Sequence, residues 1–343
     1  MKKLITLLFC LCIGNAYAIS WRLNNNPAID ADFSTFQAAH DSAAAGDTIY
    51  VEGTGNDNHY GNITISKKLI LIGPGYFLTE NDSTYANSVL ARFLSIYIQS
   101  TAPGTGIYGL YIFTNDGNTH SLRIRASNVI VSRNNFHFSG YNKILIDANV
   151  ENVSIIQNYA FSIETTSNSI VAKNLLIANN YIQENIDLNS ISNAIITNNL
   201  IRYRLYAVYN SLIKNNILYE NHAQDVLCVN NGGNNVSYNL IASALITGGP
   251  YGQGNVGGVI MESVFVGYPT QGTYSTDGRW QLKPQGPAIG AGEGGIDCGI
   301  FGGALPYVLS GLPPVPRIYE AIIPTAGSNV SGLPVIIKAK AQN

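Results

Sequence analysis

The sequence is poor in charge, and this shortage limits the partners it can have. Only 12% of its 343 residues are charged, and the formal net charge is −2. If Lys2 and Lys3 are removed with an N-terminal leader, 17 basic residues remain against 21 acidic ones, a net charge of −4. A chain without a basic excess lacks the attraction that nucleic acids and anionic membranes exert on their partners. We therefore expect neither as a partner.

Cysteine is also scarce, with four residues in the whole chain. Cys10 and Cys12 fall in the leader described below, which leaves Cys228 and Cys298. Two cysteines cannot build a disulfide framework, although an exported protein permits a single bridge. Whether Cys228 and Cys298 pair is left open by the sequence. The alternation of Val226 and Cys228 indicates a small side chain in the core.

The N-terminal apolar run, Leu4 to Ile13, is too short to span a bilayer. Two lysines precede it and Ala16–Ala18 follows as a small-residue cleavage site, so residues 1–18 read as a secretory signal peptide. Cys12 lacks the small residue that normally precedes a lipidated cysteine, which disfavours a lipoprotein. We expect a mature chain that begins near Ile19 and is secreted, periplasmic or held at the cell surface.

Histidine is too scattered for a zinc site, because the five residues form no pair at ligand spacing. The loop Gly55–Gly61 resembles a cation-binding loop in composition, but no glutamate stands twelve positions on. We therefore expect no cofactor, with Ca²⁺ as the lesser alternative to a plain turn.

What the sequence does contain is a repeat, which recurs six times between Asn128 and Ile241. An asparagine closes each repeat, with a β-branched residue three positions before it and an apolar residue two after it. The β-branched column is Val131, Ile155, Ile177, Ile196, Ile213 and Val236. The asparagine column is Asn134, Asn158, Asn180, Asn199, Asn216 and Asn239. The apolar column is Phe136, Ala160, Ile182, Ile201, Leu218 and Ile241.

The asparagines are 24, 22, 19, 17 and 23 residues apart. These spacings are too irregular for helical hairpins and too short for propeller blades, and they suit one turn of a parallel β-solenoid. Strands of successive turns lie about 4.8 Å apart, so an inward β-branched column stacks continuously. Asparagine tolerates the left-handed backbone of a sharp bend and can bond its neighbours in a ladder. We predict an internal Asn ladder in an all-β solenoid.

Both ends of this solenoid carry recognisable sequence. An amphipathic helix is predicted within Asp32–Ala45, N-capped at Asp32 or Ser34, and a half-buried strand follows Gly46. The stretch FQAAHDSAAAGDTIYV with ITISKKLILIGPG resembles the opening of pectin-lyase-like right-handed parallel β-helix proteins. The closing WQLKPQGPAIGAGEGGIDCGIFGG is similar to the final turns of secreted bacterial members of that superfamily.

This resemblance implies one right-handed parallel β-helix with an N-terminal capping helix. The expected organisation is residues 1–18 signal peptide, 19–48 N-terminal segment and capping helix, 49–303 parallel β-helix, and 304–343 Pro-rich connector and C-terminal hairpin. At about 22 residues a turn the helix would have roughly 11 or 12 turns, including one through Ile260–Val266. The terminal hairpin is expected to cap the second open end, with an export or attachment tail as the alternative.

Enzymes that this chain resembles cut acidic polysaccharides, either as calcium-dependent lyases or as hydrolases with clustered aspartates. The sequence has no paired adjacent aspartates, no His-bracketed glycine motif, no Trp-Ile-Asp-His stretch and no Arg-Xaa-Pro-Xaa-Xaa-Arg. A lyase needs a cation to neutralise the uronate and a base near its C5 proton. Catalysis is therefore in doubt, although the fold implied by the resemblance is not.

One cluster of polar residues recurs at the same place in successive repeats. Glu184, Tyr203 and Glu220 stand just beyond the apolar column, where adjacent turns would stack them. The two glutamates would lie two turns apart, roughly 9–10 Å, near the upper limit for an inverting glycosidase. An arginine beside a tyrosine also suits a sugar acid. The neighbours considered with them are Asp187, Arg202, Arg204, Tyr206, His222 and Asp225.

Two functions follow from these features. We expect an exported monomeric β-helix that binds a glycan or has a structural role, with Glu184 and Glu220 as weak catalytic candidates and Asp187, Arg202, Tyr203, Arg204, Tyr206 and His222 as binding candidates. The alternative is a polysaccharide lyase or glycoside hydrolase acting on an acidic polysaccharide. Solvated bend residues without function are the plainest interpretation of the cluster.

Overall fold

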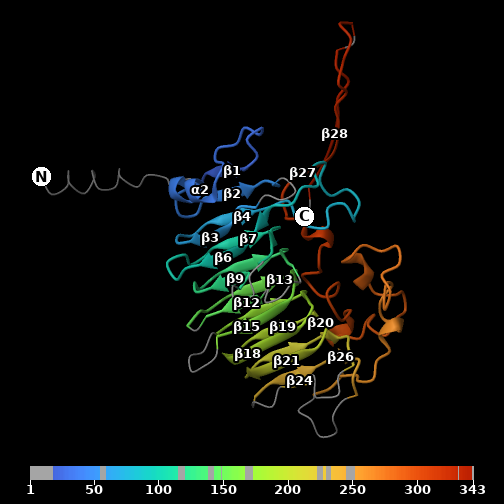
Figure 1. Cartoon of the computed structure of the whole chain (residues 1–343). Coiled ribbons are helices and arrows are strands. Elements are labelled where there is room, and N and C mark those ends of the chain that lie inside the picture. The colour runs from blue at the N-terminus through green and yellow to red at the C-terminus, as the bar shows by residue number, and fades with distance from the viewer. Residues whose placement is uncertain are drawn as a thin grey trace, which may run out of the picture.

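The structure is a computed structural model in which three parallel sheets wind around one core as a right-handed parallel β-helix (Figure 1). The expected fold class is confirmed. The structure describes residues 18–54, 59–114, 120–137, 143–147, 149–166, 173–221, 227–228, 233–244, 252–330 and 332–341.

The three sheets are named A, B and C, and each turn visits them in the order A, C, B. Sheet A contains β1 (Ser20–Leu23), β2 (Thr48–Val51), β4 (Ile70–Ile72), β7 (Gly106–Tyr108), β10 (Ile130–Ser132), β13 (Ser154–Ile156), β16 (Leu176–Ala178), β19 (Ile195–Thr197), β22 (Leu212–Lys214) and β25 (Asn235–Ser237). Sheet C contains β5 (Arg92–Phe93), β8 (Tyr111–Ile112), β11 (Asn135–Phe136), β14 (Tyr159–Ala160), β17 (Tyr181–Ile182), β20 (Leu200–Ile201), β23 (Ile217–Leu218) and β26 (Leu240–Ile241). Sheet B contains β3 (Asn62–Ile65), β6 (Ser95–Ile98), β9 (Leu122–Ile124), β12 (Lys143–Ile146), β15 (Ser162–Thr165), β18 (Asn185–Ser192), β21 (Arg204–Tyr209) and β24 (Leu227–Cys228).

The described strands form seven complete turns, from β4 to β24, rather than the 11 or 12 expected. The predicted number is too high because it assumes that every residue up to 303 belongs to a turn of the solenoid. The last solenoid strand is β26, however, and the 19 residues between β4 and β5 form a loop instead of strands. Ile260–Val266, expected as a further turn, contains the 3-10 helix η1 (Met261–Ser263).

The Asn ladder is present, and it is fully buried. The backbone N–H of each ladder asparagine donates to the side-chain oxygen of the ladder asparagine in the next turn. The side-chain amide of each ladder asparagine donates to the same oxygen, and also to backbone carbonyls of its own turn and of the preceding turn. Beyond Asn239 the ladder continues to Asn255, which accepts from the Asn239 backbone N–H at 3.0 Å. The sequence repeat did not include Asn255, because that turn has no strand after it to carry the motif.

Helix α2 (Phe36–Ser42) lies at the N-terminal end, beside β1 and β3. Thr35 is its N-cap, since the Thr35 hydroxyl accepts from the Ala38 N–H, so neither Asp32 nor Ser34 has that role. Phe36 and Ala39 are buried in the solenoid core, and the Phe36 ring meets the Phe93 ring edge-on, with the centroids 6.3 Å apart. The helix therefore covers the first open end of the core, as predicted.

After β26 the chain turns back and covers the outer face of sheet C (Figure 1). This C-terminal segment, residues 252–316, contains η1, η2 (Gly278–Trp280), η3 (Glu293–Gly295) and η4 (Leu309–Gly311). A second apolar core lies beneath it, where Trp280 packs on Tyr181 and Tyr219 with ring centroids 5.1 and 4.8 Å apart. Residues up to 303 were expected in the solenoid, but residues 252–303 run alongside it instead.

The C-terminal segment is held by the residues that immediately precede the ladder. These residues all have a left-handed backbone, with φ between 56° and 59°, and they are Arg133, Gln157, Asn179, Asn198, Asn215 and Tyr238. Asn179 donates to the carbonyls of Ile300 and Gly302, both at 2.8 Å. In the Asn179–Asn180 pair, the first asparagine therefore binds the covering segment, and the second belongs to the internal ladder.

Cys298 lies within this segment, buried and free. Its thiol donates to the Tyr238 carbonyl, and burial raises the pKa of the thiol to about 12. At neutral pH the reactive thiolate is therefore scarce. The side chain of Cys228 lies outside the described residues.

The chain ends in an antiparallel hairpin of β27 (Arg317–Ile322) and β28 (Ile336–Lys340). Arg317 is buried and donates to the carbonyls of Ser83 and Thr84, and Ala86 donates to the Ile318 carbonyl. These contacts place the hairpin beside the first turns, where it projects from the molecule (Figure 1). The expected hairpin is present, but it does not cap the second open end, because its root binds the loop between β4 and β5.

Most of the signal peptide, residues 1–17, lies outside the described part of the chain, so that assignment stays a prediction. Among the described residues, no helix has the length and apolar character needed to cross a bilayer.

Candidate functional site

Four of the predicted residues meet at the bend from sheet C to sheet B. We call Glu184, Arg202, Tyr203 and Glu220 the bend cluster. The repeat there is so short that Arg202 and Tyr203 alone connect β20 to β21. Backbone bonds stack the turns, since Tyr203 N–H donates to the Glu184 carbonyl and Glu220 N–H to the Arg202 carbonyl. These positions are therefore stacked in successive turns, as predicted.

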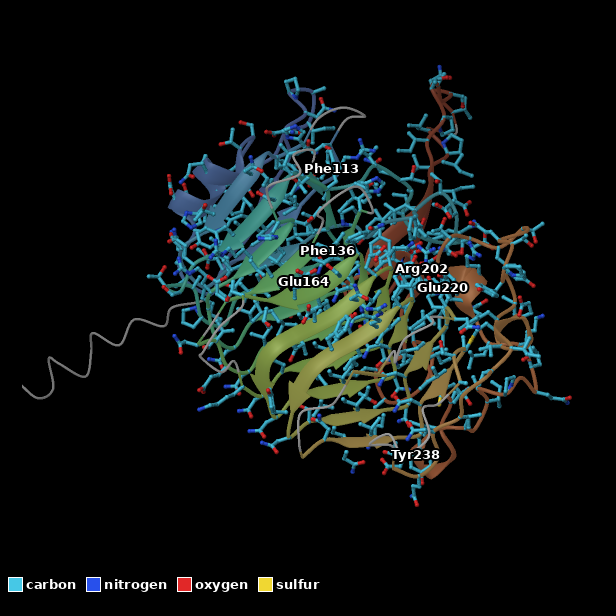
Figure 2. The ribbon with its side chains drawn as sticks, turned by 60° about the horizontal axis from the view of Figure 1, so that its bottom comes forward. Phe113, Phe136, Glu164, Arg202, Glu220 and Tyr238 are labelled. Carbon is cyan, nitrogen blue, oxygen red and sulfur yellow. The ribbon has the colours of Figure 1, made fainter. Side chains whose placement is uncertain are left out.

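Arg202 is the centre of the bend cluster. Its Nε donates to Glu220 Oε1 at 2.7 Å, and its guanidinium carbon lies 4.7 Å from the centroid of the Tyr203 ring. Figure 2 shows Arg202 and Glu220 side by side next to the C-terminal segment. Both side chains are partly accessible, at 28% and 30%. An aromatic face, a fixed guanidinium and a carboxylate are thus presented together to solvent.

Glu184 lies on the other side of Arg202 from Glu220, one turn earlier in the stack. Partial burial raises the pKa of Glu184, Arg202 opposes this increase, and Glu220 adds to it. Among the described residues no cation lies within ion-pair distance of Glu184. The two glutamates therefore have different environments, because Glu220 is paired with Arg202 and Glu184 is shifted toward its neutral form.

The outer face of sheet B carries a second set of polar side chains, which we call the sheet B row. Strand pairing aligns Tyr97 with Arg123, Glu164 with Asp187, and Asp187 with Tyr206 on successive turns, and Leu145 links the two halves. The members are Tyr97, Arg123, Leu145, Glu164, Asp187 and Tyr206. Of these, only Asp187 and Tyr206 were predicted from the sequence as site residues.

Cations and carboxylates beside this row are joined in ion pairs. Asp147 binds two guanidinium groups, with Arg123 Nε and Arg125 Nε both at 2.9 Å. Lys143 Nζ lies 2.7 Å from Glu164, and Arg125 also donates to the Tyr97 hydroxyl at 2.7 Å. Alternation along each strand could have indicated that these side chains point outward. It could not have indicated which side chains pair, because the bonded residues are 21 to 28 positions apart in the sequence. Only the register of the turns brings them together.

The predicted site is thus divided between two adjoining surfaces. Asp187, Arg204 and Tyr206 belong to sheet B, where Arg204 donates to the Tyr206 hydroxyl and its guanidinium carbon lies 5.5 Å from that ring. His222 and Asp225 lie outside the described residues. Because the bend leads directly into sheet B, one extended ligand could contact both surfaces.

The described residues contain no group of three metal-ligating side chains suited to a metal ion. The loop considered for Ca²⁺ includes residues 55–58, which are outside the described part of the chain, so the calcium alternative is not tested.

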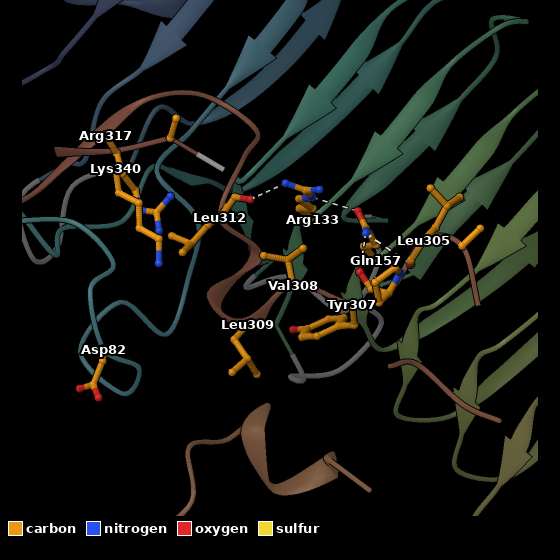
Figure 3. Close-up of a pocket in the computed structure, with 13 residues that line it drawn as sticks. Asp82, Arg133, Gln157, Leu305, Tyr307, Val308, Leu309, Leu312, Arg317 and Lys340 are labelled. Atoms are coloured by element: carbon orange, nitrogen blue, oxygen red, sulfur yellow. Dashed lines mark hydrogen bonds between the residues drawn. The ribbon is translucent and has the colours of Figure 1, made fainter. Parts of the chain in front are cut away.

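A cavity of about 740 Å³ lies between the C-terminal segment and the hairpin (Figure 3). Its arginines serve to hold the segment in place. Arg133 bridges Gln157 and the Leu312 carbonyl, at 2.9 and 2.7 Å, and Gln157 in turn donates to the Pro306 carbonyl at 2.6 Å. We therefore interpret this cavity as part of the attachment of the C-terminal segment.

Of the comparisons with known proteins, only the one with solved structures found a match. No protein-family model matches the chain, and no curated protein matches it. Among solved structures it is similar to the pectin methylesterase from Aspergillus niger in deglycosylated form, at 14% identity and a TM-score of 0.36, over 79% of this chain and 91% of that one. A penultimately deglycosylated form of that enzyme gives 15% identity and a TM-score of 0.32 over the same shares. The likeness is one of fold.

Proposed function

We propose that the protein is an exported β-helix that binds a polysaccharide along the bend cluster and the adjoining sheet B row, without cleaving it. The observation that carries the proposal is Arg202, which is paired with Glu220 and packed over Tyr203 at an accessible bend. A sugar ring can stack on such an aromatic face while a fixed guanidinium and carboxylate bind its hydroxyls or a carboxylate.

The repeat of the solenoid supports an extended ligand. Turns follow each other at about 4.8 Å, so polar groups recur in a line along the axis of the helix. Tyr97, Tyr203 and Tyr206 provide ring surface at intervals along this line, and the ion pairs hold the charged groups in fixed orientations. A polymer with a short chemical repeat presents the same groups at regular intervals.

The ion pairs also argue against chemistry at most of these positions. Asp147, Glu164 and Glu220 each bind a cation at less than 3 Å. A carboxylate held in this way is fixed in place by its cation and is less free to reach a bond of the ligand. These groups are suited to accept hydrogen bonds from a ligand.

A polysaccharide hydrolase or lyase is the second candidate, and Glu184 is the observation that favours it. Its pKa is raised by burial, with Glu220 adding to the increase, and a carboxylic acid with a raised pKa near a second carboxyl group is what an acid and base pair requires. Release of reducing ends or unsaturated uronates from pectin, alginate or a glycosaminoglycan, abolished by Glu184→Gln, would support this function over simple binding.

The binding proposal predicts a loss of affinity when the bend cluster is truncated. Arg202→Ala/Tyr203→Ala should weaken the binding free energy by about 1–3 kcal/mol, the usual effect of losing a stacked or charge-assisted contact. Retardation in polysaccharide affinity gels measures this change. Lys173→Ala is the matched control, because Lys173 is an exposed cation on another bend whose contact with Glu151 is 4.0 Å long. A double variant that binds with wild-type affinity would place the site elsewhere.

A further inference from the structure

A second cavity, of about 550 Å³, lies on the outer face of sheet C and is separate from the bend cluster. The C-terminal segment covers sheet C from Tyr159 onward but leaves the first strands of the sheet less enclosed. Tyr111 of β8 and Asn135 of β11 form the floor there, since they are paired in register. The loop between β4 and β5 closes the opposite side through Phe77 and Glu80. Three strand steps separate β11 from β20, where the bend cluster begins.

The cavity has aromatic walls. Phe77 meets Tyr159 edge-on at 5.2 Å, and the Tyr111 ring lies 5.7 Å from the His137 ring. The Arg92 guanidinium carbon is 6.0 Å from the centroid of Tyr111. Such rings present flat apolar faces, against which the C–H groups of a sugar pack.

Its polar groups are poised toward a ligand rather than toward each other. Asn135 is only 3% exposed, yet its side-chain amide has no hydrogen-bond partner among the described residues, and it lines the cavity. The Tyr111 hydroxyl and the His137 ring also have no hydrogen-bond partner within the described part of the chain. These donors and acceptors are therefore available to bond a ligand in the cavity.

We propose that this cavity, the Tyr111 pocket, binds one pyranose residue of a glycan, with the sugar ring against an aromatic face and its hydroxyls bonded to Asn135, Tyr111 and His137. Amide, phenol and imidazole each donate and accept, as hydroxyl groups do. The volume is in the range of about 300–1,000 Å³ that is usual for small-molecule sites. Arg92 and Glu80 bring one charge of each sign to the lining, which favours an uncharged sugar.

Saturation-transfer NMR with the methyl glycosides of glucose, galactose, mannose and N-acetylglucosamine, each at millimolar concentration, tests the proposal. We expect at least one to bind the wild-type protein, and Tyr111→Phe/Asn135→Leu to lower its affinity about tenfold or more through the loss of two bonded groups. His137→Ala changes an exposed residue, so it should weaken binding even if the double variant folds poorly.

Two controls separate this pocket from the bend cluster. Tyr108→Phe removes a hydroxyl from sheet A, outside the cavity, and Arg202→Ala removes the centre of the bend cluster; both should bind the monosaccharide with wild-type affinity. Failure of all four glycosides to bind, undiminished binding by Tyr111→Phe/Asn135→Leu and His137→Ala, or loss of binding in Arg202→Ala would each overturn the assignment.

Discussion

Asn180→Ala should lower the free energy of unfolding by about 3 kcal/mol or more, because several buried groups lose their partner at once. The Asn180 side chain accepts from the backbone N–H and the amide of Asn158, at 2.9 and 3.0 Å. It donates to the carbonyls of Ile155 and Ala178 and to Asn199, at 2.8 to 3.1 Å. Asn180 is fully buried, so water cannot replace these bonds. Equilibrium unfolding in urea measures the change.

Asn174→Gly in the same repeat is the matched control. Asn174 has a left-handed backbone, with φ of 55°, and its side chain donates to Asn152 at the exposed surface, at 3.2 Å. Glycine keeps this backbone conformation without strain, so the change should cost less than about 1 kcal/mol. Equal losses for the two variants would mean that burial of the ladder is not what stabilises the fold.

Trp280→Ala should destabilise the protein by about 3–5 kcal/mol, the usual cost of truncating a buried tryptophan. Trp280 is 4% exposed, and its ring packs on Tyr181, Tyr219 and Phe265 at centroid distances of 5.1, 4.8 and 5.4 Å. It joins the C-terminal segment to the outer face of sheet C. The result should therefore include increased proteolysis within residues 252–316.

Tyr274→Ala is the control for that variant, since Tyr274 belongs to the same segment but is 43% exposed. Its loss should change the unfolding free energy by no more than about 0.5 kcal/mol. If Trp280→Ala were as stable and as resistant to protease as Tyr274→Ala, the C-terminal segment would not be packed on sheet C.

The solenoid could be predicted from sequence because its information is local and repeated. Val131, Ile155 and Ile177 point inward in register, and Asn134, Asn158 and Asn180 form one ladder, as the spacing required. A one-residue error in the pattern would turn the inward column to solvent, so the register is strongly specified. The same repetition placed Glu184, Tyr203 and Glu220 in one stack.

What could not be predicted depends on contacts between distant parts of the chain. Trp280 packs on Tyr181 from 99 residues away, and Asn179 binds the Ile300 carbonyl from 121 residues away. Nothing in the sequence of residues 252–303 distinguishes a further turn from a segment that covers one, because both are apolar and rich in glycine. The Tyr111 pocket was missed for the same reason, since its walls come from five separate parts of the chain, within 77–92, at 111, within 135–137, at 159 and at 276.

One measurement tests most directly the central claim that the protein binds a polysaccharide without cleaving it. The mature protein is incubated with pectins, alginates and glycosaminoglycans, the complexes are isolated, and the length of the recovered polysaccharide is determined by size-exclusion chromatography with light scattering. The proposed function predicts that at least one polysaccharide is retained by the wild-type protein, is retained less by Arg202→Ala/Tyr203→Ala, and is recovered at its original length. Retention of none of them, or recovery of shortened chains, would contradict it.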